Sequence, residues 1–254
     1  MPDPENPPGF VVRTEAQKAA WDNGYRLEHG IKDGWLHYGS TTALGSLWIA
    51  GASPQGPWLL SIDHSGVVAE IGTLLPSPVA GPGLATFMLA TLAQLHAALD
   101  RVYKLALSLP DAPLTRFQAK TAGLPRTTEA ERLVVQRIGQ DVFRNALMDY
   151  WGGRCPLTGI TDPALLRASH ILPWADCTDA QRLDVHNGLL LSALWDAAFD
   201  CGLVSFADDG SVLTSSQLSE TARGALSIDH TPPLAGLRDA HRANLAVHRA
   251  RNGF

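Results

Sequence analysis

The residues best suited to chemistry lie between Ala168 and Asp200. His170 is a single imidazole in an otherwise strand-like run, and Asn187 precedes a second apolar run. Asp196 and Asp200 follow with a spacing of four, which on a helix places two carboxylates on one face, about 5–6 Å apart. Such carboxylates repel each other unless a cation lies between them. The segment therefore combines one imidazole with a candidate cation site.

Each of these residues also has a purely structural interpretation. His170 could be a hydrogen-bonded residue at the end of a strand, and Asn187 with Gly188 could be a simple turn. Asp196 could be a solvated helix residue, and Asp200 could cap the next turn or pair with an arginine. Only the joint order and spacing of the residues favour chemistry over these alternatives.

The order and spacing resemble the HNH nuclease family. In its ββα-metal finger a histidine closes the first strand, an asparagine opens the second, and metal ligands lie one turn apart on the following helix. The likeness extends over roughly Asp141 to Phe254, under half of the chain, and is to the bacterial branch that lacks zinc-binding cysteine pairs. The matching pieces are Tyr150 to Gly159, Leu165 to Trp174, Arg182-Leu183-Asp184, Asn187 to Ser192, Phe199 to Phe206, and His248-Arg249 with Phe254.

The resemblance implies a role for each residue. His170 is the expected general base, since an imidazole titrates near neutral pH and can take a proton from water. Asn187 is expected to bond across the loop between the strands and to hold the base in position. Asp196 and Asp200 stand where the family often has histidines, and their hard oxygens indicate Mg²⁺ or Mn²⁺. Ser169 is a second departure, because relatives often have a metal ligand there and a serine hydroxyl is a poor one.

Several arginines near the finger are candidates for contacts with DNA phosphates, because a guanidinium binds phosphate bidentately. They are Arg154, Arg167, Arg182 and Arg249, with Arg251 as a further candidate. The alternative for each of them is a surface ion pair.

Periodicity and capping signals predict the elements that must position these residues. Thr128 and Glu131 form a capping box before a helix of roughly 25 residues that leads into Gly152-Gly153. Short apolar runs predict strands at 165–172 and 189–191, a two-turn helix at 193–200, and a hairpin of strands 203–206 and 212–214 across Asp208-Asp209-Gly210. A last helix is expected from Leu237 to Asn252.

The first half of the chain predicts a small antiparallel sheet under one long helix. A short helix is expected at 14–23, strands at 35–38, 44–50, 58–62 and 67–71, and the long helix from Leu84 to Val102. The proline-punctuated stretch 107–125 predicts no regular structure. The fold class is therefore α+β, with a β-rich domain at 1–120 and the finger domain, flanked by helices, at 126–254.

Composition restricts the functional classes. The chain has 254 residues, 45% of them hydrophobic, which excludes wholesale disorder. Its net charge of −5 argues against a general polyanion binder, so any contact with nucleic acid must be local. Three cysteines without a Cys-x-x-Cys pair predict free thiols and no structural zinc. Because no apolar run reaches about 18 residues and the N-terminus lacks a signal-peptide layout, we expect a cytoplasmic protein that does not cross a membrane.

With the resemblance, these observations predict a metal-dependent DNA endonuclease of the restriction or defence type that acts on double-stranded DNA. The first domain would select the DNA, modified or unmodified. Its aromatic residues could line a cage for a flipped base, and core packing is their alternative use. One finger per chain would favour a homodimer for double-strand cutting. Two other classes stay open: a catalytically degenerate DNA-binding protein, and a toxin or interaction module.

Overall fold

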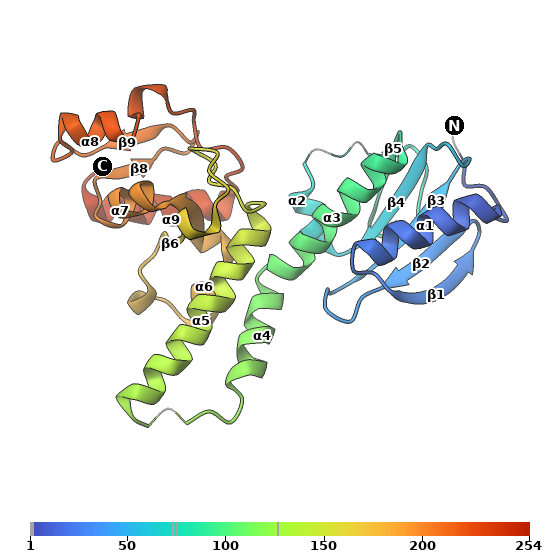
Figure 1. The fold of residues 1–254 in the computed structure, drawn as a ribbon, viewed down its shortest axis with the longest axis horizontal. Coiled ribbons are helices and arrows are strands. Elements are labelled where there is room, and N and C mark those ends of the chain that lie inside the picture. Colours follow the sequence, from blue (N-terminus) through green and yellow to red (C-terminus); the bar gives the residue numbers. More distant parts are fainter. Residues whose placement is uncertain (1–2, 73, 75, 126) are drawn as a thin grey trace. The chain divides into compact units, whose positions relative to one another are not determined.

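The computed structural model describes residues 3–72, 74, 76–125 and 127–254. Two compact units make up the chain, Met1–Ala112 and Pro113–Phe254 (Figure 1). Both units combine helices with antiparallel strands, which confirms the α+β class. The domain limits 1–120 and 126–254 stay predictions, and residue 126 itself lies outside the described residues.

The first unit is built on a five-stranded antiparallel sheet in the order β1-β2-β3-β4-β5. The strands are β1 (Leu27–Lys32), β2 (Trp35–Gly39), β3 (Ser46–Gly51), β4 (Trp58–Asp63) and β5 (Ala85–Leu89). The helices are α1 (Phe10–Asp22), α2 (Ser65–Glu70) and α3 (Leu92–Ser108). Ile49, Leu60 and Phe87 lie opposite one another in register and are buried, as expected for one face of a sheet that packs on helices.

The start predicted for the long helix of the first unit, Leu84, is wrong. Residues Ala85–Leu89 pair with β4 as strand β5, and the helix begins only at Leu92. Within β5, Phe87 and Leu89 are buried and alternate with more exposed neighbours, which is the period of a strand rather than of a helix. The hydroxyl of Thr91 then accepts a hydrogen bond from the Gln94 backbone N–H and starts α3.

Two further elements of the first unit differ from the prediction. The expected strand at 67–71 overlaps helix α2, because His64 Nδ1 accepts a hydrogen bond from the Val67 backbone N–H at 3.2 Å and caps a first helical turn. Strand β1 was not predicted, since all six of its residues are exposed and leave no alternating pattern. It forms by pairing with β2.

Most of the aromatic residues of the first sheet serve its core. Trp35, Tyr38 and Trp58 are at most 7% exposed. Trp48 is half-buried and stacks on His37, with ring centroids 4.4 Å apart. The buried rings therefore favour core packing over a cage for a flipped base.

The second unit begins with two helices and ends with the finger and its extensions. The helices before the finger are α4 (Asp111–Thr121) and α5 (Glu129–Tyr150). The finger consists of β6 (Leu166–His170), the one-turn helix α6 (Asp179–Arg182), β7 (Gly188–Ser192) and α7 (Ala193–Asp200). Strands β8 (Val204–Phe206) and β9 (Val212–Thr214), and helices α8 (Glu220–Ala225) and α9 (Asp239–Asn252), follow.

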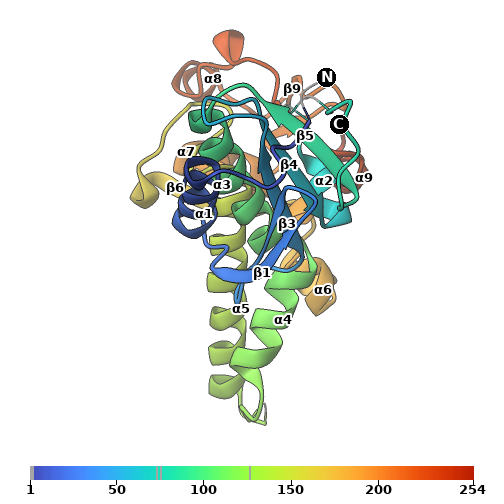
Figure 2. The same cartoon turned by 90° about the vertical axis from the view of Figure 1, so that its right-hand side faces the viewer.

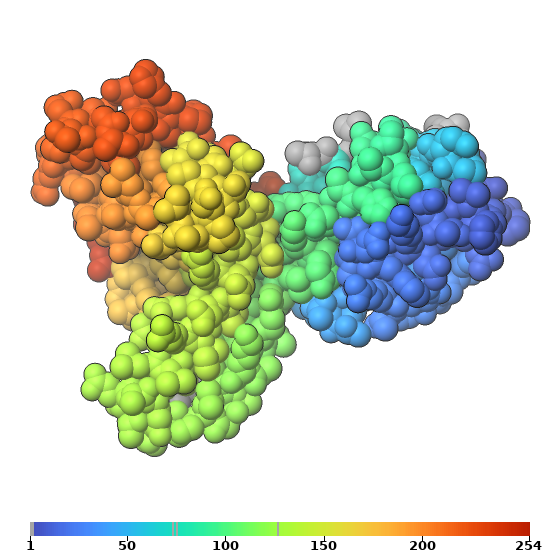
Figure 3. Space-filling view, in the orientation of Figure 1, coloured from blue at the N-terminus to red at the C-terminus, as the bar shows by residue number. Residues whose placement is uncertain are grey.

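Helix α4 corrects the prediction of no regular structure at 107–125. Its Pro113 lies in the first turn, where a helix needs no backbone N–H, so the proline is compatible with a helix start. Phe117 and Thr121 are buried at 4% and 5% exposure. The views of Figures 1 and 2 show α4 and α5 side by side and running in opposite directions, and in Figure 3 the end of α4 and the start of α5 project from the rest of the unit.

The local signals of the finger are confirmed. Thr128 and Glu131 form the predicted capping box at the start of α5. Strands β6 and β7 pair antiparallel, with His170 opposite Gly188, and α7 follows β7 without a linker. A Cβ at Gly188 would come within 2.4 Å of the Phe143 ring, so glycine lets β7 approach α5 closely.

Candidate active site

One cleft in the second unit gathers three of the four predicted site residues. His170, Asp196 and Asp200 line this cavity of about 460 Å³. Ser169 and the end of α9, including His248 and Arg251, form other parts of its wall. The strand pair and the helix that follows it thus bring the imidazole and the two carboxylates to a common solvent-filled space.

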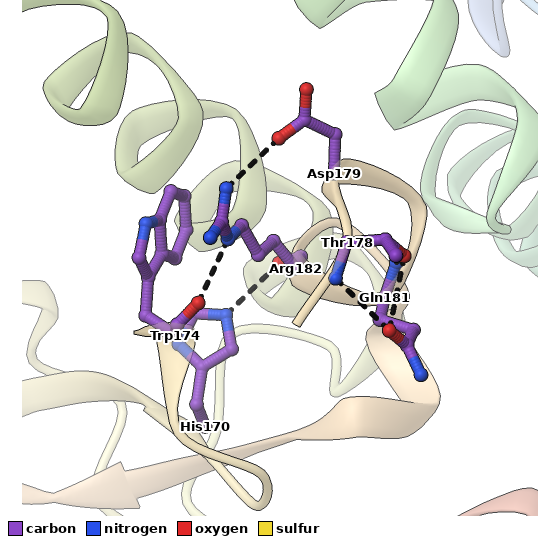
Figure 4. Close-up of polar contacts among 6 residues, drawn as sticks. All are labelled: His170, Trp174, Thr178, Asp179, Gln181 and Arg182. Atoms are coloured by element: carbon purple, nitrogen blue, oxygen red, sulfur yellow. Dashed lines mark hydrogen bonds and ion pairs between the residues drawn. The ribbon is translucent and has the colours of Figure 1, made fainter. Parts of the chain in front are cut away.

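His170 closes β6 and is held by the loop that follows it. Its Nε2 lies 2.9 Å from the backbone oxygen of Arg182 (Figure 4). A carbonyl oxygen can only accept a hydrogen bond, so Nε2 carries the proton and Nδ1 keeps its lone pair. The ring stacks on Phe143, with centroids 3.8 Å apart, and meets the edge of Trp174 at 5.3 Å. The imidazole therefore has one orientation and one tautomer.

The surroundings also set the charge of His170. Burial lowers the pKa of the imidazole below its usual value of 6.5. The Arg182 carbonyl and the charge of Asp200 oppose this effect, but burial outweighs them. At neutral pH the ring is consequently neutral, which is the form that can accept a proton.

Asn187 does not line the cleft but lies behind it, 2% exposed. Its Oδ1 accepts a hydrogen bond from the Leu172 backbone N–H at 2.8 Å, and its Nδ2 donates to the Gln181 carbonyl at 3.1 Å. The Asn187 carbonyl also accepts from the Ile171 backbone N–H at 3.0 Å. One side chain thus ties together both ends of the loop that leaves His170.

Asp196 and Asp200 lie one turn apart on α7, the first partly buried and the second exposed at the helix end. Burial raises the pKa of Asp196, and the neighbouring charge of Asp200 raises it further, whereas Arg167 opposes both. The charged pair is therefore unfavourable by itself. A cation between the two carboxylates would remove this repulsion.

Ser169 provides a third oxygen beside this pair. Its Oγ is buried and has no hydrogen-bond partner among the described residues. The hydroxyl lies near enough to Asp196 to favour its charged form, but without the geometry of a hydrogen bond. Two carboxylates and an unpartnered hydroxyl fit Mg²⁺ or Mn²⁺, which bind oxygen, and Mg²⁺ commonly keeps several waters. Among the described residues, no group of three or more His, Cys, Asp or Glu side chains is arranged to hold a metal ion.

The predicted phosphate-binding arginines do not share one place. Arg167 lines the cleft, and Arg251 does so while pairing with Asp176 at 2.7 Å. The guanidinium of Arg249 donates to the Phe206 carbonyl and pairs with Asp208 at 2.8 Å. Arg249 therefore makes the ion pair that was the alternative to a phosphate contact. Arg154 is exposed in the turn after α5. Arg182 is engaged within the protein, by contacts described below.

Three rings at or beside the cleft were missed as site residues. Phe143 and Trp174 contact the ring of His170, and Trp174 and His248 line the cleft. His248 bonds to Ser205 Oγ through Nδ1 and to the Phe199 carbonyl through Nε2, so both ring nitrogens are used in joining α9 to α7 and β8. No local sequence pattern predicts which residues these three rings contact, because each contact joins separate elements.

Comparison with known proteins identifies the same region. Residues 155–207 match the model of the HNH endonuclease family, a narrower range than the likeness read from the sequence. The search of curated proteins found no match. In the part of the chain that the structure describes, helices long and apolar enough to span a bilayer are absent. The matched range contains β6, β7 and α7, and with them the part of the cleft wall that carries His170, Asp196 and Asp200. The C-terminal half of the chain carries an HNH endonuclease domain, which supports a nuclease that acts on nucleic acid.

Proposed function

We propose that the protein is a metal-dependent DNA endonuclease in which His170 is the general base and Asp196 and Asp200 hold Mg²⁺ or Mn²⁺. The observation that carries the proposal is the shared cleft, lined by both carboxylates and by an imidazole whose Nε2 is committed to a backbone carbonyl. This arrangement leaves Nδ1 as the only basic atom of the ring. Asn187 holds the loop that sets the position of that ring.

The proposed reaction is hydrolysis of a phosphodiester bond. A water molecule attacks phosphorus, His170 Nδ1 takes its proton, and the bond to the leaving 3′ oxygen breaks while that oxygen takes a proton from solvent water. A divalent ion, when bound, neutralises the negative charge that builds on the phosphate and on the leaving oxygen. Arg167, at the wall of the same cleft, is placed to contact a neighbouring phosphate, whereas Arg251 lines the cleft but is paired with Asp176. Of the other predicted arginines, only Arg154 stays a candidate for a phosphate contact.

The biological setting of this activity is part of the proposal. A small finger reads little sequence by itself, so we assign selection of the DNA, modified or unmodified, to the first unit. With that division we propose a restriction or defence role on double-stranded DNA in the cytoplasm. Two fingers are needed to cut both strands, which favours a homodimer as the working species.

Plasmid cleavage tests the activity. The protein with Mg²⁺ is expected to nick supercoiled DNA, and both EDTA and His170→Ala are expected to abolish nicking. Binding of DNA without cleavage under any divalent ion would instead identify a catalytically degenerate DNA-binding protein. Equal rates on unmodified, methylated and hydroxymethylated DNA would remove selection by modification.

A further inference from the structure

The one-turn helix α6 presents its last two carbonyls to the two signature residues of the finger. The Arg182 oxygen accepts the hydrogen bond from His170 Nε2, and the Gln181 oxygen accepts the one from Asn187 Nδ2. Carbonyls at a helix C-terminus have no partner within the helix and must find one outside it. Both histidine orientation and asparagine anchoring therefore depend on where α6 lies.

A helix of four residues is too short to be stable alone, so other contacts must hold α6 in place. At its start, Thr178 and Gln181 form a capping box (Figure 4). At its end, the Arg182 guanidinium donates from Nε to the Trp174 carbonyl at 2.8 Å and pairs with Asp179 at 3.0 Å. It also lies over the Trp174 ring, 5.2 Å from the ring centroid.

These contacts connect Arg182 to His170 by two routes. Its backbone oxygen accepts a hydrogen bond from Nε2, and its side chain fixes Trp174, whose ring packs against the imidazole with the two planes inclined by 88°. Phe143 covers the face of the same ring. The side chain of Arg182 is 26% exposed and its charge is balanced by Asp179, so it is poorly placed to serve as a free phosphate ligand.

We propose that Arg182 is a positioning residue, whose side chain locks α6 onto the Trp174 turn and thereby fixes the tautomer and orientation of His170. This revises its predicted role as a phosphate contact. The consequence for cleavage rests on the proposed function. The tautomer itself does not, because it can be observed without DNA or metal.

The chain offers a matched control. Arg242 on α9 has the same bonding pattern as Arg182: Nε donates to a backbone carbonyl, that of Asp208, at 2.9 Å, and Nη1 pairs with an aspartate three residues earlier, Asp239, at 2.8 Å. Its side chain is 38% exposed, and it is not among the residues that line the cleft. Arg242→Gln therefore removes equivalent contacts away from His170.

Nitrogen-15 NMR of histidine-labelled full-length protein near pH 8 gives the first readout. The signals of His170 are assigned by their loss in His170→Ala. The wild type and Arg242→Gln are expected to show the Nε2–H tautomer, and Arg182→Gln a mixture of both tautomers. Asp179→Ala keeps Arg182 but removes the ion pair that orients its guanidinium, at a 45% exposed site that should not disturb folding, and is expected to act in the same direction. An Nδ1–H tautomer in the wild type, or an unchanged tautomer in Arg182→Gln and Asp179→Ala, would overturn the proposal.

DNA binding and cleavage give the second readout. Positioning predicts that kcat falls about 10- to 100-fold in Arg182→Gln, because small misplacements of a reacting group are costly, while Kd for DNA stays within about twofold. A phosphate contact predicts a weaker Kd, a salt dependence of log K smaller by about 0.9, and an unchanged kcat, and this result would refute positioning. If the wild type cleaves no DNA, the proposed function fails, and the tautomer measurement still decides the role of Arg182.

Discussion

The imidazole of His170 stacks on the phenyl ring of Phe143, with centroids 3.8 Å apart and planes inclined by 17°. Phe143 comes from α5 and is 1% exposed, so it removes water from one face of the imidazole. Loss of water disfavours the charged ring, which is why burial lowers the pKa of His170. The stacking partner thus acts on the charge of the proposed base as well as on its position.

The lowered pKa predicts the pH dependence of cleavage. At saturating DNA and Mg²⁺, kcat should rise about tenfold per pH unit at low pH and level off above the pKa of His170, at a midpoint below 6.5. A midpoint above 7 in the measured pH–rate profile would contradict the assignment.

The stability of the folded protein should also increase with pH. A histidine with a lowered pKa binds fewer protons in the folded state than in the unfolded state. The free energy of unfolding should therefore decrease as the pH falls below about 6.5.

Replacing Asp196 should separate metal binding from folding. Its pKa is raised by burial and then by Asp200, so its charged form opposes folding at every pH above its ordinary value of 3.8. Without metal at pH 7, Asp196→Asn should raise Tm by about 2–4 °C, the change that corresponds to about 1 kcal/mol in a chain of this size. With Mg²⁺, the variant should lose both cleavage and the stabilisation by metal.

Thermal unfolding with and without Mg²⁺ measures both effects. Asp141→Asn is the matched control, because Asp141 is an exposed helix carboxylate on α5. A lower Tm of metal-free Asp196→Asn would show that the carboxylate stabilises the fold and is not under repulsion.

Changing Ser169 to aspartate should strengthen metal binding. The Ser169 hydroxyl is buried and unpartnered among the described residues, beside the two carboxylates. A third carboxylate should raise the affinity for Mn²⁺ by about tenfold or more, because ligand charge tunes cation affinity, and should destabilise the metal-free protein. Calorimetric titration without DNA measures the affinity. Ser169→Asn supplies nearly the same volume without charge, and equal affinities of the two variants would place the metal elsewhere.

Removing the side chain of Asn187 should destabilise the finger loop. Asn187→Ala removes a buried side chain and leaves the Leu172 N–H and the Gln181 carbonyl without these part-buried partners. An unsatisfied buried group costs about 1–3 kcal/mol, so the free energy of unfolding should fall by an amount in that range. Urea denaturation of the full chain measures it. Asn23→Ala, which removes part-buried bonds to the Ala19 carbonyl and to His96 Nδ1 in the first unit, is the control and should cost less.

The finger was predictable because its signals are local. The capping box at Thr128, the two-turn helix at 193–200 and the hairpin at 203–214 each depend on residues within a few positions of one another. The spacing of His170, Asn187 and the two aspartates likewise needs only the order of strand, strand and helix. Elements without local signals were missed or misassigned: β1 has no buried residue, and β5 exists only because it pairs with β4.

The sequence by itself determined which side chains could do the chemistry and in which order the finger presents them. Only the tertiary structure decided the surroundings of those side chains. These are the hydrogen bond of His170 to the Arg182 carbonyl, the burial of its ring against Phe143 of α5, and the unpartnered hydroxyl of Ser169 among the described residues. Those properties arise from desolvation and from contacts between separate elements, which the chain acquires only when it is folded.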